Sequence, residues 1–263
     1  MISIIIPCYN TGQYLEDALE SVFNCNFQDY EIIIVNDGSD DNQTNQILGL
    51  IKHKKIKIIT QENKGLSSAR NLGVRNSNGE FVLFLDSDNK ILDGYFEQAI
   101  KFFKEDSTVG VVYSIPEFFG STNTPRFQTK AYNFDALLAG NFIDACSFVR
   151  RIAFDSVGGF DENKNLRISE DWDLWIRLGI SGWKFQFINE YLFKYRIRED
   201  SMIGTADDVI IEQTQKYLGQ KYGYVIHKKY RQYYRVLLKI QHRPFLYFFK
   251  IIYYKYILRR TII

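Results

Sequence analysis

The first half of the sequence alternates short runs of branched aliphatic residues with segments whose apolar residues recur at helical spacing. The strand-like runs are Ile2 to Ile6, Glu31 to Val35, Lys57 to Thr60, Phe81 to Leu85 and Val109 to Tyr113. Helical periodicity fills the intervals, at residues 11–24, 40–52, 66–75 and 93–103. Near-continuous apolar strands that alternate with helices predict an α/β fold with a mostly parallel sheet covered on both faces.

The alternation changes beyond residue 113. Residues 114–133 place prolines and glycine among polar residues, which indicates a loop-rich excursion. Ser169 is suited to cap a helix that runs to Ile180. Two more strands are predicted after it, at residues 184–188 and 191–197.

The charge distribution separates a C-terminal region from the rest of the chain. After Glu212 there is no Asp or Glu, but there are 12 Lys and Arg residues. The part of the chain up to Glu212 therefore holds 21 of the 33 basic residues and all 31 acidic residues. Such an asymmetry suggests that the two parts do different jobs. We expect an α/β domain over residues 1–205, divided near residue 113, and a basic aromatic helical appendage over residues 206–263.

Cysteine usage and the first residues favour the cytoplasm. Cys8, Cys25 and Cys146 are few and odd in number, so neither a disulfide framework nor a zinc site is expected. Met1 is followed directly by a strand-like run, without the basic and apolar regions of a signal peptide. No charge-free apolar run reaches the ~18 residues that a membrane span needs.

Polar and acidic residues follow three of the predicted strands. The segments are Pro7-Cys8-Tyr9-Asn10, Asn36-Asp37-Gly38-Ser39-Asp40 and Asp86-Ser87-Asp88. Parallel α/β sheets bind ligands beyond the carboxyl ends of their strands, so we expect these segments to form one site. The chain has neither the glycine-rich dinucleotide turn nor the P-loop pattern, so a bound diphosphate needs another source of positive charge.

The Asp86-Ser87-Asp88 triplet offers that charge through a metal ion. Carboxylates two residues apart at a strand end project to the same side. Their hard oxygen atoms suit Mg²⁺ or Mn²⁺, which also binds substrate phosphates and stabilises the charge of a departing diphosphate. On its own such a triplet is more often an acidic turn, so its meaning depends on the motifs around it.

Six motifs occur in order along roughly residues 1–200. They are Pro7-x-Tyr9-Asn10, Val35-Asn36-Asp37-Gly38-Ser39-x-Asp41, Asn63-x-Gly65-x4-Arg70-Asn71-x-Gly73, Phe84-Leu85-Asp86-x-Asp88, Gly158-Gly159-Phe160-Asp161-Glu162 and Ser169-Glu170-Asp171-x-Asp173-Leu174-Trp175. The series resembles the inverting family 2 glycosyltransferases with the GT-A fold. The resemblance implies a Rossmann-like half that binds a nucleotide sugar over residues 1–113 and a mixed acceptor half over residues 114–205.

The resemblance also implies roles for individual residues. Tyr9 would stack on a uracil base, Asp37 would accept its N3–H, and Arg70 would contact the nucleotide or its phosphates. Asp86 would contact ribose or metal, and Asp88 would ligate Mn²⁺ or Mg²⁺ directly. The other residues expected around the nucleotide are Pro7, Asn10, Gly65 and Ser87.

Asp171 is the candidate general base. Inversion at an anomeric carbon needs one carboxylate to deprotonate the acceptor hydroxyl, whereas a metal-bound diphosphate leaves without a protein acid. The start of a helix lowers the pKa of an Asp, and desolvation by Trp172 and Trp175 would offset this effect. A second interpretation is that Glu170 and Asp171 merely favour the positive end of the helix. Glu170 and Trp172 are also candidates for contact with the diphosphate or the acceptor.

One segment departs from the pattern of the family. Relatives often have a Tyr-Arg-x-His segment whose histidine can complete the metal site, whereas this chain has Tyr195-Arg196-Ile197-Arg198. Arginine cannot ligate a metal. We therefore expect either that Arg198 contacts the diphosphate or that a third metal ligand comes from elsewhere. His53, His227 and His242 do not lie at matching positions.

The appendage interleaves aromatic and aliphatic residues with Lys and Arg over residues 222–260. The segment His242-Arg243-Pro244-Phe245 indicates a helix break and restart, and the stretch from Phe245 to Leu258 is apolar around most of its circumference. It fits an in-plane helix at an anionic membrane surface on the inner face of the cell membrane. Packing onto the catalytic domain or a second subunit is the alternative. Nucleic-acid binding is disfavoured because no nucleic-acid-binding fold accompanies the appendage.

The sequence therefore predicts a metal-dependent inverting glycosyltransferase. It would move a sugar from a nucleotide sugar, most simply a UDP-sugar, to a glycan or lipid-linked acceptor in bacterial surface polysaccharide assembly. A sugar-phosphate nucleotidyltransferase would need a glycine-rich, arginine-containing loop after the first strand, which is missing. A non-catalytic nucleotide-sugar-binding or scaffold subunit stays open, although the presence of Asp37, Asp86, Asp88 and Asp171 together argues against it.

Overall fold

The computed structural model describes residues 1–166, 168–202 and 204–257. The end of the predicted appendage, with Leu258, Arg259 and Arg260, lies outside the described residues. The chain divides into two compact units, Met1–Thr214 and Gln215–Ile263. Within the part of the chain that the structure describes, no helix is long and apolar enough to cross a membrane.

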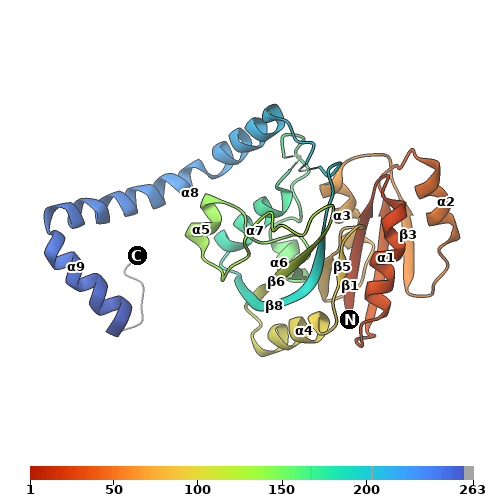
Figure 1. Ribbon diagram of the computed structural model, residues 1–263, viewed down its shortest axis with the longest axis horizontal. Coiled ribbons are helices and arrows are strands. Elements are labelled where there is room, and N and C mark those ends of the chain that lie inside the picture. The colour runs from red at the N-terminus through yellow and green to blue at the C-terminus, as the bar shows by residue number, and fades with distance from the viewer. Residues whose placement is uncertain (167, 203, 258–263) are drawn as a thin grey trace. The chain divides into compact units, whose positions relative to one another are not determined.

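The first unit is organised around an eight-stranded sheet with the strand order β3-β2-β1-β4-β7-β6-β8-β5 (Figure 1). β3, β2, β1 and β4 are parallel to one another, β7 is antiparallel to both β4 and β6, β8 is parallel to β6, and β5 is antiparallel to β8. The predicted α/β fold, with a parallel first half and a mixed second half, is confirmed. The strands are β1 (Ile2–Cys8), β2 (Tyr30–Asn36), β3 (Ile56–Thr60), β4 (Phe81–Phe84), β5 (Lys90–Ile91), β6 (Val109–Gly120), β7 (Phe148–Arg150) and β8 (Lys184–Ile197).

Helices cover the sheet because its central strands are apolar on both faces. Every residue of β1 is buried, as a strand covered on two sides requires. α3 packs against β1 and β2, and Gly73 permits this approach because a Cβ there would collide with Ile5. The helices of this unit are α1 (Gly12–Phe23), α2 (Asn42–Leu50), α3 (Leu66–Arg75), α4 (Tyr95–Glu105), α5 (Phe134–Ala139), α6 (Arg151–Ser156) and α7 (Glu170–Ile180).

The middle of the chain differs from the sequence prediction. β6 continues to Gly120, so the predicted loop begins seven residues late, because residues 114–120 pair with β8. The two strands predicted at 184–188 and 191–197 form the single strand β8, and its register against β6 shifts near Ile115. The short elements β5, α5, β7 and α6 were not predicted, since two to six residues carry too little periodicity to detect.

The helices that follow complete the description. α8 (Asp208–His242) begins in the first unit and continues into the second. α9 (Pro244–Ile252) starts directly after Arg243, and a π-helical turn, η1 (Tyr253–Ile257), follows it. The predicted break and restart at residues 242–245 is confirmed, with Pro244 at the first position of the new helix.

Candidate active site

A cavity of about 1010 Å³ opens where β1, β2 and β4 end, and the starts of α3 and α7 and the end of β8 complete its walls. Every site residue predicted from the sequence lines it except Trp172, so the structure brings these residues together, while their roles stay predictions. The predicted residues in the lining are Pro7, Tyr9, Asn10, Asp37, Gly65, Arg70, Asp86, Ser87, Asp88, Glu170, Asp171 and Arg198.

Asp37 organises the loop that precedes α3. Its Oδ1 accepts from Nε2 of Gln61 at 2.6 Å and from the backbone N–H of Lys64 at 2.9 Å. Its Oδ2 accepts from the backbone N–H of Gly65 at 2.9 Å. Gly65 has a φ of 90°, a left-handed conformation that glycine adopts without strain. The buried Asp37 carboxylate thus fixes one wall of the cavity and still borders the open space.

Asn10 joins the ends of β1 and β2. Its Nδ2 donates to Oδ1 of Asp40 at 2.6 Å, and its Oδ1 accepts from the backbone N–H groups of Asp40 and Asp41. Its φ of 54° belongs to the left-handed region, which asparagine tolerates better than most residues. This conformation leaves the neighbouring Tyr9 exposed at the cavity, as a base-stacking role would need.

Arg70 connects two motifs that lie far apart in the sequence. Its Nη2 donates to Oδ1 of Asp86 at 2.7 Å, and its Nη1 donates to Oε1 of Glu170 at 2.5 Å. Although burial alone lowers the pKa of Arg70, the two carboxylates hold that pKa above its ordinary value. With both Nη groups committed to carboxylates, Arg70 acts as a bridge between the triplet and the start of α7.

The acidic triplet and the residue that follows it are held by Thr11, which directly precedes α1, and by Arg196 of β8. The hydroxyl groups of Thr11 and Ser87 lie 2.7 Å apart. Nε of Arg196 donates to the carbonyl oxygen of Asp88 at 3.0 Å, and the backbone N–H of Arg196 donates to Oδ1 of Asn89 at 2.9 Å. These contacts fix the direction in which Asp88 faces the cavity.

Arg198 lies directly against Asp88. Its Nε is 2.8 Å from Oδ2 of Asp88, but the N–H does not point at this oxygen, so the contact is a charge pair without an aligned hydrogen bond. Burial and the nearby Asp86 carboxylate raise the pKa of Asp88 to about 6, and Arg198 opposes this rise. The residue that stands where relatives often have a histidine therefore neutralises part of the acidic triplet.

The donor set fits a divalent cation that keeps most of its shell for substrate and water. In the described part of the chain, no ion pair or side-chain hydrogen bond involves Oδ2 of Asp86 or Oδ1 of Asp88. No group of three or more His, Cys, Asp and Glu residues suited to a metal ion occurs among those same residues. Two carboxylates with free oxygens match Mg²⁺ or Mn²⁺ bound together with phosphates, not a cage made by protein alone.

Asp171 occupies the first turn of α7 at the cavity wall. Its Oδ2 accepts from Nδ2 of Asn141 at 3.0 Å, and its Oδ1 accepts from the backbone N–H of Trp172 at 2.7 Å. Burial, together with the carboxylates of Glu170 and Asp144, raises the pKa of Asp171 well above its ordinary value. Desolvation is the largest cause of this rise, and a carboxylate with a raised pKa is a better base near neutral pH.

Two residues near α7 behave differently from the sequence expectation. The indole of Trp172 donates from Nε1 to the carbonyl oxygen of Leu137 in α5 at 2.6 Å, so it anchors α5 and is not part of the cavity lining. Ser169 stands at the expected cap position, but its φ is 77° and its side chain makes no capping hydrogen bond. The helix start that it was predicted to stabilise is held instead by the Arg70–Glu170 pair.

Asp144 is a site residue that the sequence did not reveal. It lines the cavity just before β7, and its Oδ1 accepts from the backbone N–H of Cys146 at 2.8 Å. Burial and the Asp86 carboxylate raise the pKa of Asp144 to about 7. Asp144 and Asn141 lie in a segment without periodicity or a recognisable motif, so no sequence signal singled them out.

The stability of the protein should depend on the ionisation of Asp144 in a testable way. Its pKa is about 7 in the folded state and about 3.9 when unfolded. The folded state therefore binds the proton more tightly, and stability is lost as the pH rises from about 4 to about 7. Asp144→Asn should raise the free energy of unfolding by about 1 kcal/mol or more at a pH of about 8 and change it little at a pH of about 4. Urea denaturation at both pH values measures this difference.

The exposed Asp155 gives the matched control for this experiment. Asp155→Asn should leave the free energy of unfolding nearly unchanged at both pH values, since a solvated carboxylate gains little from neutralisation. An Asp144→Asn variant that is less stable than the parent at alkaline pH would contradict the buried, proton-binding state of Asp144.

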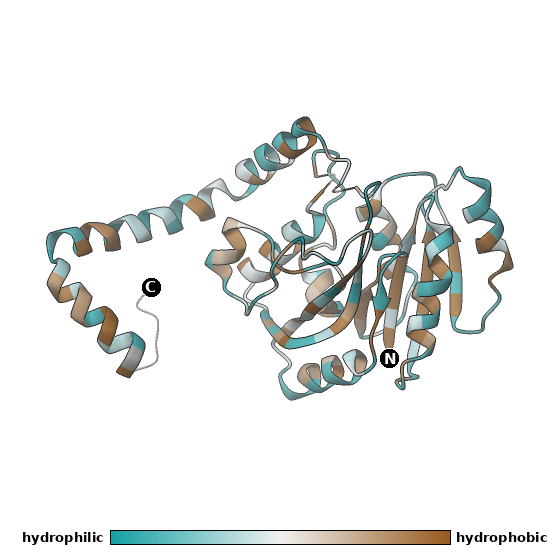
Figure 2. Ribbon diagram, in the orientation of Figure 1, coloured by the Kyte–Doolittle hydropathy of each residue, from teal (hydrophilic) through white to brown (hydrophobic). Residues whose placement is uncertain are grey.

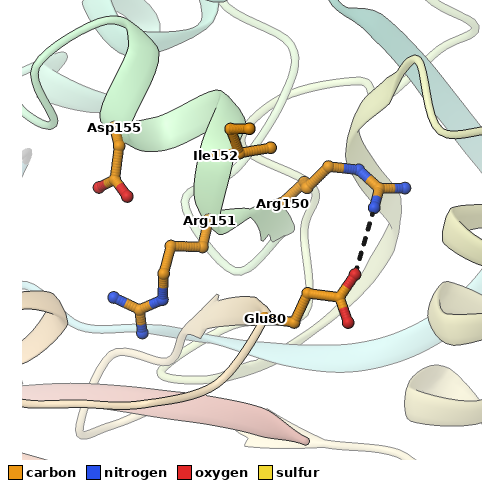
Figure 3. Close-up of a pocket in the computed structure, with 5 residues that line it drawn as sticks. All are labelled: Glu80, Arg150, Arg151, Ile152 and Asp155. Atoms are coloured by element: carbon orange, nitrogen blue, oxygen red, sulfur yellow. Dashed lines mark ion pairs between the residues drawn. The ribbon is translucent and has the colours of Figure 1, made fainter.

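A second, smaller pocket of about 260 Å³ shares no residue with this cavity (Figure 3). Glu80, Arg150, Arg151, Ile152 and Asp155 line it, and Glu80 pairs with Arg150 at 3.5 Å. Both arginines are already used structurally. Nε of Arg150 donates to a carbonyl oxygen of β6, and Arg151 donates to two carbonyl oxygens and a hydroxyl around the end of α3. The larger cavity is therefore the candidate active site.

The fold and the position of the site define the chain as a GT-A type α/β protein. A crystal structure of TarS from S. aureus, residues 1–349 in complex with UDP-GlcNAc, superposes with a TM-score of 0.66 at 22% identity and covers 81% of this chain and 64% of TarS 1–349. Glycosyl transferase family 2 matches residues 3–158, and Glycosyl transferase family group 2 matches residues 81–263. The chain belongs to glycosyltransferase family 2.

Curated relatives agree with this assignment. The minor teichoic acid biosynthesis protein GgaB of Bacillus subtilis is 32% identical over 75% of this chain, which corresponds to 23% of GgaB. The uncharacterized glycosyltransferase RT0329 of Rickettsia typhi is 31% identical over 78% of this chain and 67% of its own length. The chain spans less than a third of the first curated relatives that it matches, such as a glycosyltransferase of Rickettsia bellii at 29%.

Proposed function

We propose that the chain transfers a sugar, with inversion, from a UDP-sugar to a hydroxyl group of a cell-surface glycan or of its lipid-linked precursor. The observation that carries this proposal is that Asp37, the Asp86-Ser87-Asp88 triplet and Asp171 line one and the same cavity. The UDP-GlcNAc complex of TarS supports a uridine nucleotide donor, and the name of GgaB supports an acceptor of the teichoic acid type.

The proposal assigns the two halves of the domain to different substrates. Residues 1–113 would bind the nucleotide sugar, residues 114–205 would bind the acceptor, and residues 206–263 would form the appendage. Tyr9 offers an aromatic face for the base, and the Asp37 carboxylate is suited to accept the N3–H of uracil. Cytosine has an acceptor at its N3 position, so this arrangement favours uridine over cytidine nucleotides.

The proposed chemistry needs one general base and positive charges that stabilise the departing diphosphate. In the proposed mechanism Asp171 accepts the proton of the acceptor hydroxyl while the oxygen of that hydroxyl attacks the anomeric carbon. The bond from the anomeric carbon to the diphosphate breaks, and the nucleoside diphosphate leaves with the bonding electrons. Mn²⁺ or Mg²⁺, held by Asp88 and Asp86, would neutralise the charge that develops on the diphosphate. Arg198 borders the same space and adds a second positive charge that can face the phosphates.

The proposed place of action is the cytoplasm or the inner face of the cell membrane. Cys8, Cys25 and Cys146 are buried free thiols, as a reducing compartment favours. The alternative of a non-catalytic binding subunit predicts donor binding without turnover, so measured turnover separates the two proposals.

The experiment that tests this function compares nucleotide sugars as donors. The full chain with Mn²⁺ should release UDP from at least one UDP-sugar, and EDTA should lower the rate by about tenfold or more. UDP should also bind at least about tenfold more tightly than CDP. In CDP the N3 atom of cytosine is a hydrogen-bond acceptor, so it has no hydrogen to donate to the Asp37 carboxylate. A coupled UDP-release assay and calorimetric titration measure both quantities. Tight UDP binding without release from any donor in the panel would favour the binding subunit instead.

A further inference from the structure

The second half of α8 carries a stripe of apolar side chains on one face. Ile226, Tyr230, Tyr233, Leu237 and Ile240 follow one another at intervals of four, three, four and three residues, which places them on the same side of a helix. The first four are between 37% and 63% exposed. Figure 2 shows hydrophobic residues recurring along this helix. We refer to these five residues as the α8 stripe.

The opposite face of the same segment is basic. Lys228, Arg231, Arg235 and Lys239 lie at intervals of three, four and four residues, about half a turn away from the α8 stripe at ~100° per residue. All four are exposed. No Asp or Glu occurs anywhere in the chain after Glu212, so these charges have no acidic neighbours in their own segment.

α9 extends the apolar surface beyond the helix break. Phe245, Leu246, Phe248, Phe249 and Ile251 are between 41% and 79% exposed, and no residue of this helix is buried. α9 has 9 residues and η1 has 5. Even joined end to end, these two helices are shorter than the ~20 residues that span a bilayer. A helix this short cannot cross the bilayer, but its exposed apolar side chains suit the boundary between lipid headgroups and acyl chains.

We propose that the α8 stripe and α9 dock in the plane of an anionic phospholipid surface. Apolar side chains would enter the headgroup region, and the lysines and arginines of the opposite face and flanks would be attracted by the negative surface potential. A helix with aromatic and aliphatic residues on one face, and Lys and Arg on the other, is the composition that binds such surfaces. The inference stands on this charge complementarity and does not depend on the proposed glycosyl transfer.

A second copy of the same helix is a less favourable occupant. The spacing of the α8 stripe matches a coiled-coil seam, but it covers only about two heptads, fewer than the three or four that a stable seam needs. Pairing of two copies would also bring together segments that contain only positive charges, and like charges at close range oppose association. An anionic membrane can take up the apolar side chains of one face and attract the Lys and Arg side chains of the other.

Vesicle flotation of the full chain without donor or metal tests the proposal. The protein should float with phosphatidylcholine vesicles that contain about one third phosphatidylglycerol. Its partition coefficient should fall by about tenfold or more with pure phosphatidylcholine or at high salt. The double variant Phe248→Ser and Phe249→Ser should lower the partition coefficient on anionic vesicles by about tenfold or more, because two inserted aromatic rings are lost.

Two tyrosines of α8 give a matched pair of variants. Tyr230 lies in the α8 stripe and is 63% exposed, whereas Tyr224 is 79% exposed and lies on the opposite face. Tyr230→Ser should weaken flotation severalfold, and Tyr224→Ser should leave it unchanged. Absence of flotation with anionic vesicles, or equal losses in the two variants, would overturn the proposal. So would a full chain that is dimeric by light scattering, becomes monomeric with Tyr230→Ser and does not float.

Discussion

Replacing Asp171 by asparagine should lower the rate of sugar transfer by a factor of about 10² to 10⁴, the range that a general base contributes. Asparagine is nearly the same size, and its side-chain oxygen can still accept the hydrogen bond from the backbone N–H of Trp172, so only the hydrogen bond from the exposed Asn141 is lost. The geometry of the site should therefore survive, while the group that accepts the proton of the acceptor is lost. Initial rates with a saturating UDP-sugar and acceptor measure the effect.

Nucleotide binding provides the internal control for this prediction. The Asp37 carboxylate and the acidic triplet follow the ends of β2 and β4, whereas Asp171 lies on α7, so calorimetry should give an affinity for UDP that changes less than about threefold. Asp155→Asn, on the exposed surface beside the smaller pocket, should leave both the rate and the affinity unchanged. Loss of UDP affinity in parallel with the rate would show that Asp171 supports the site structurally and does not act as the base.

The sequence predicted the strands that carry the nucleotide half because local pattern and global fold agree there. β1, β2 and β4 are near-continuous apolar runs, and each is followed by the polar residues that line the cavity. α3 was predicted with its observed ends because Gly65 and a loss of periodicity after Arg75 mark them. Where strand period, turn residues and sheet topology give the same answer, a single sequence suffices.

Tertiary contacts decided the features that the sequence did not reveal. Pro116 made residues 114–120 look like a loop, yet they pair with β8 because a proline is tolerated where the strand register shifts. Asp144 and Asn141 reach the site only because β7 lies between β4 and β6 in the sheet. The Arg70–Glu170 pair joins residues 100 positions apart, and no local pattern encodes such a contact.

The bridging role of Arg70 leads to the largest expected effect on stability. Its side chain is 1% exposed, and its partners Asp86 and Glu170 are 30% and 9% exposed. Arg70→Met keeps most of the apolar stem but removes the guanidinium, which lies over the ring of Phe160, and leaves two partly buried carboxylates without their cation. Breaking a buried pair in this way costs about 3–5 kcal/mol, and the partial exposure of Asp86 places the expected loss near 3 kcal/mol. Urea unfolding near neutral pH measures it.

Arg75→Met is the matched control, since Arg75 is exposed and ends the same helix. The free energy of unfolding of this variant should fall by less than about 1 kcal/mol, which is the contribution of a cation at a helix C-terminus. Arg70→Lys should be intermediate, because one ammonium group cannot replace a planar guanidinium that contacts two carboxylates. The deficit of Arg70→Met should shrink in acid, where the stranded carboxylates become protonated, so a variant that fails to fold at neutral pH is still measurable. A free energy of unfolding within about 1 kcal/mol of the parent at neutral pH would mean that Arg70 does not hold the triplet and α7 together.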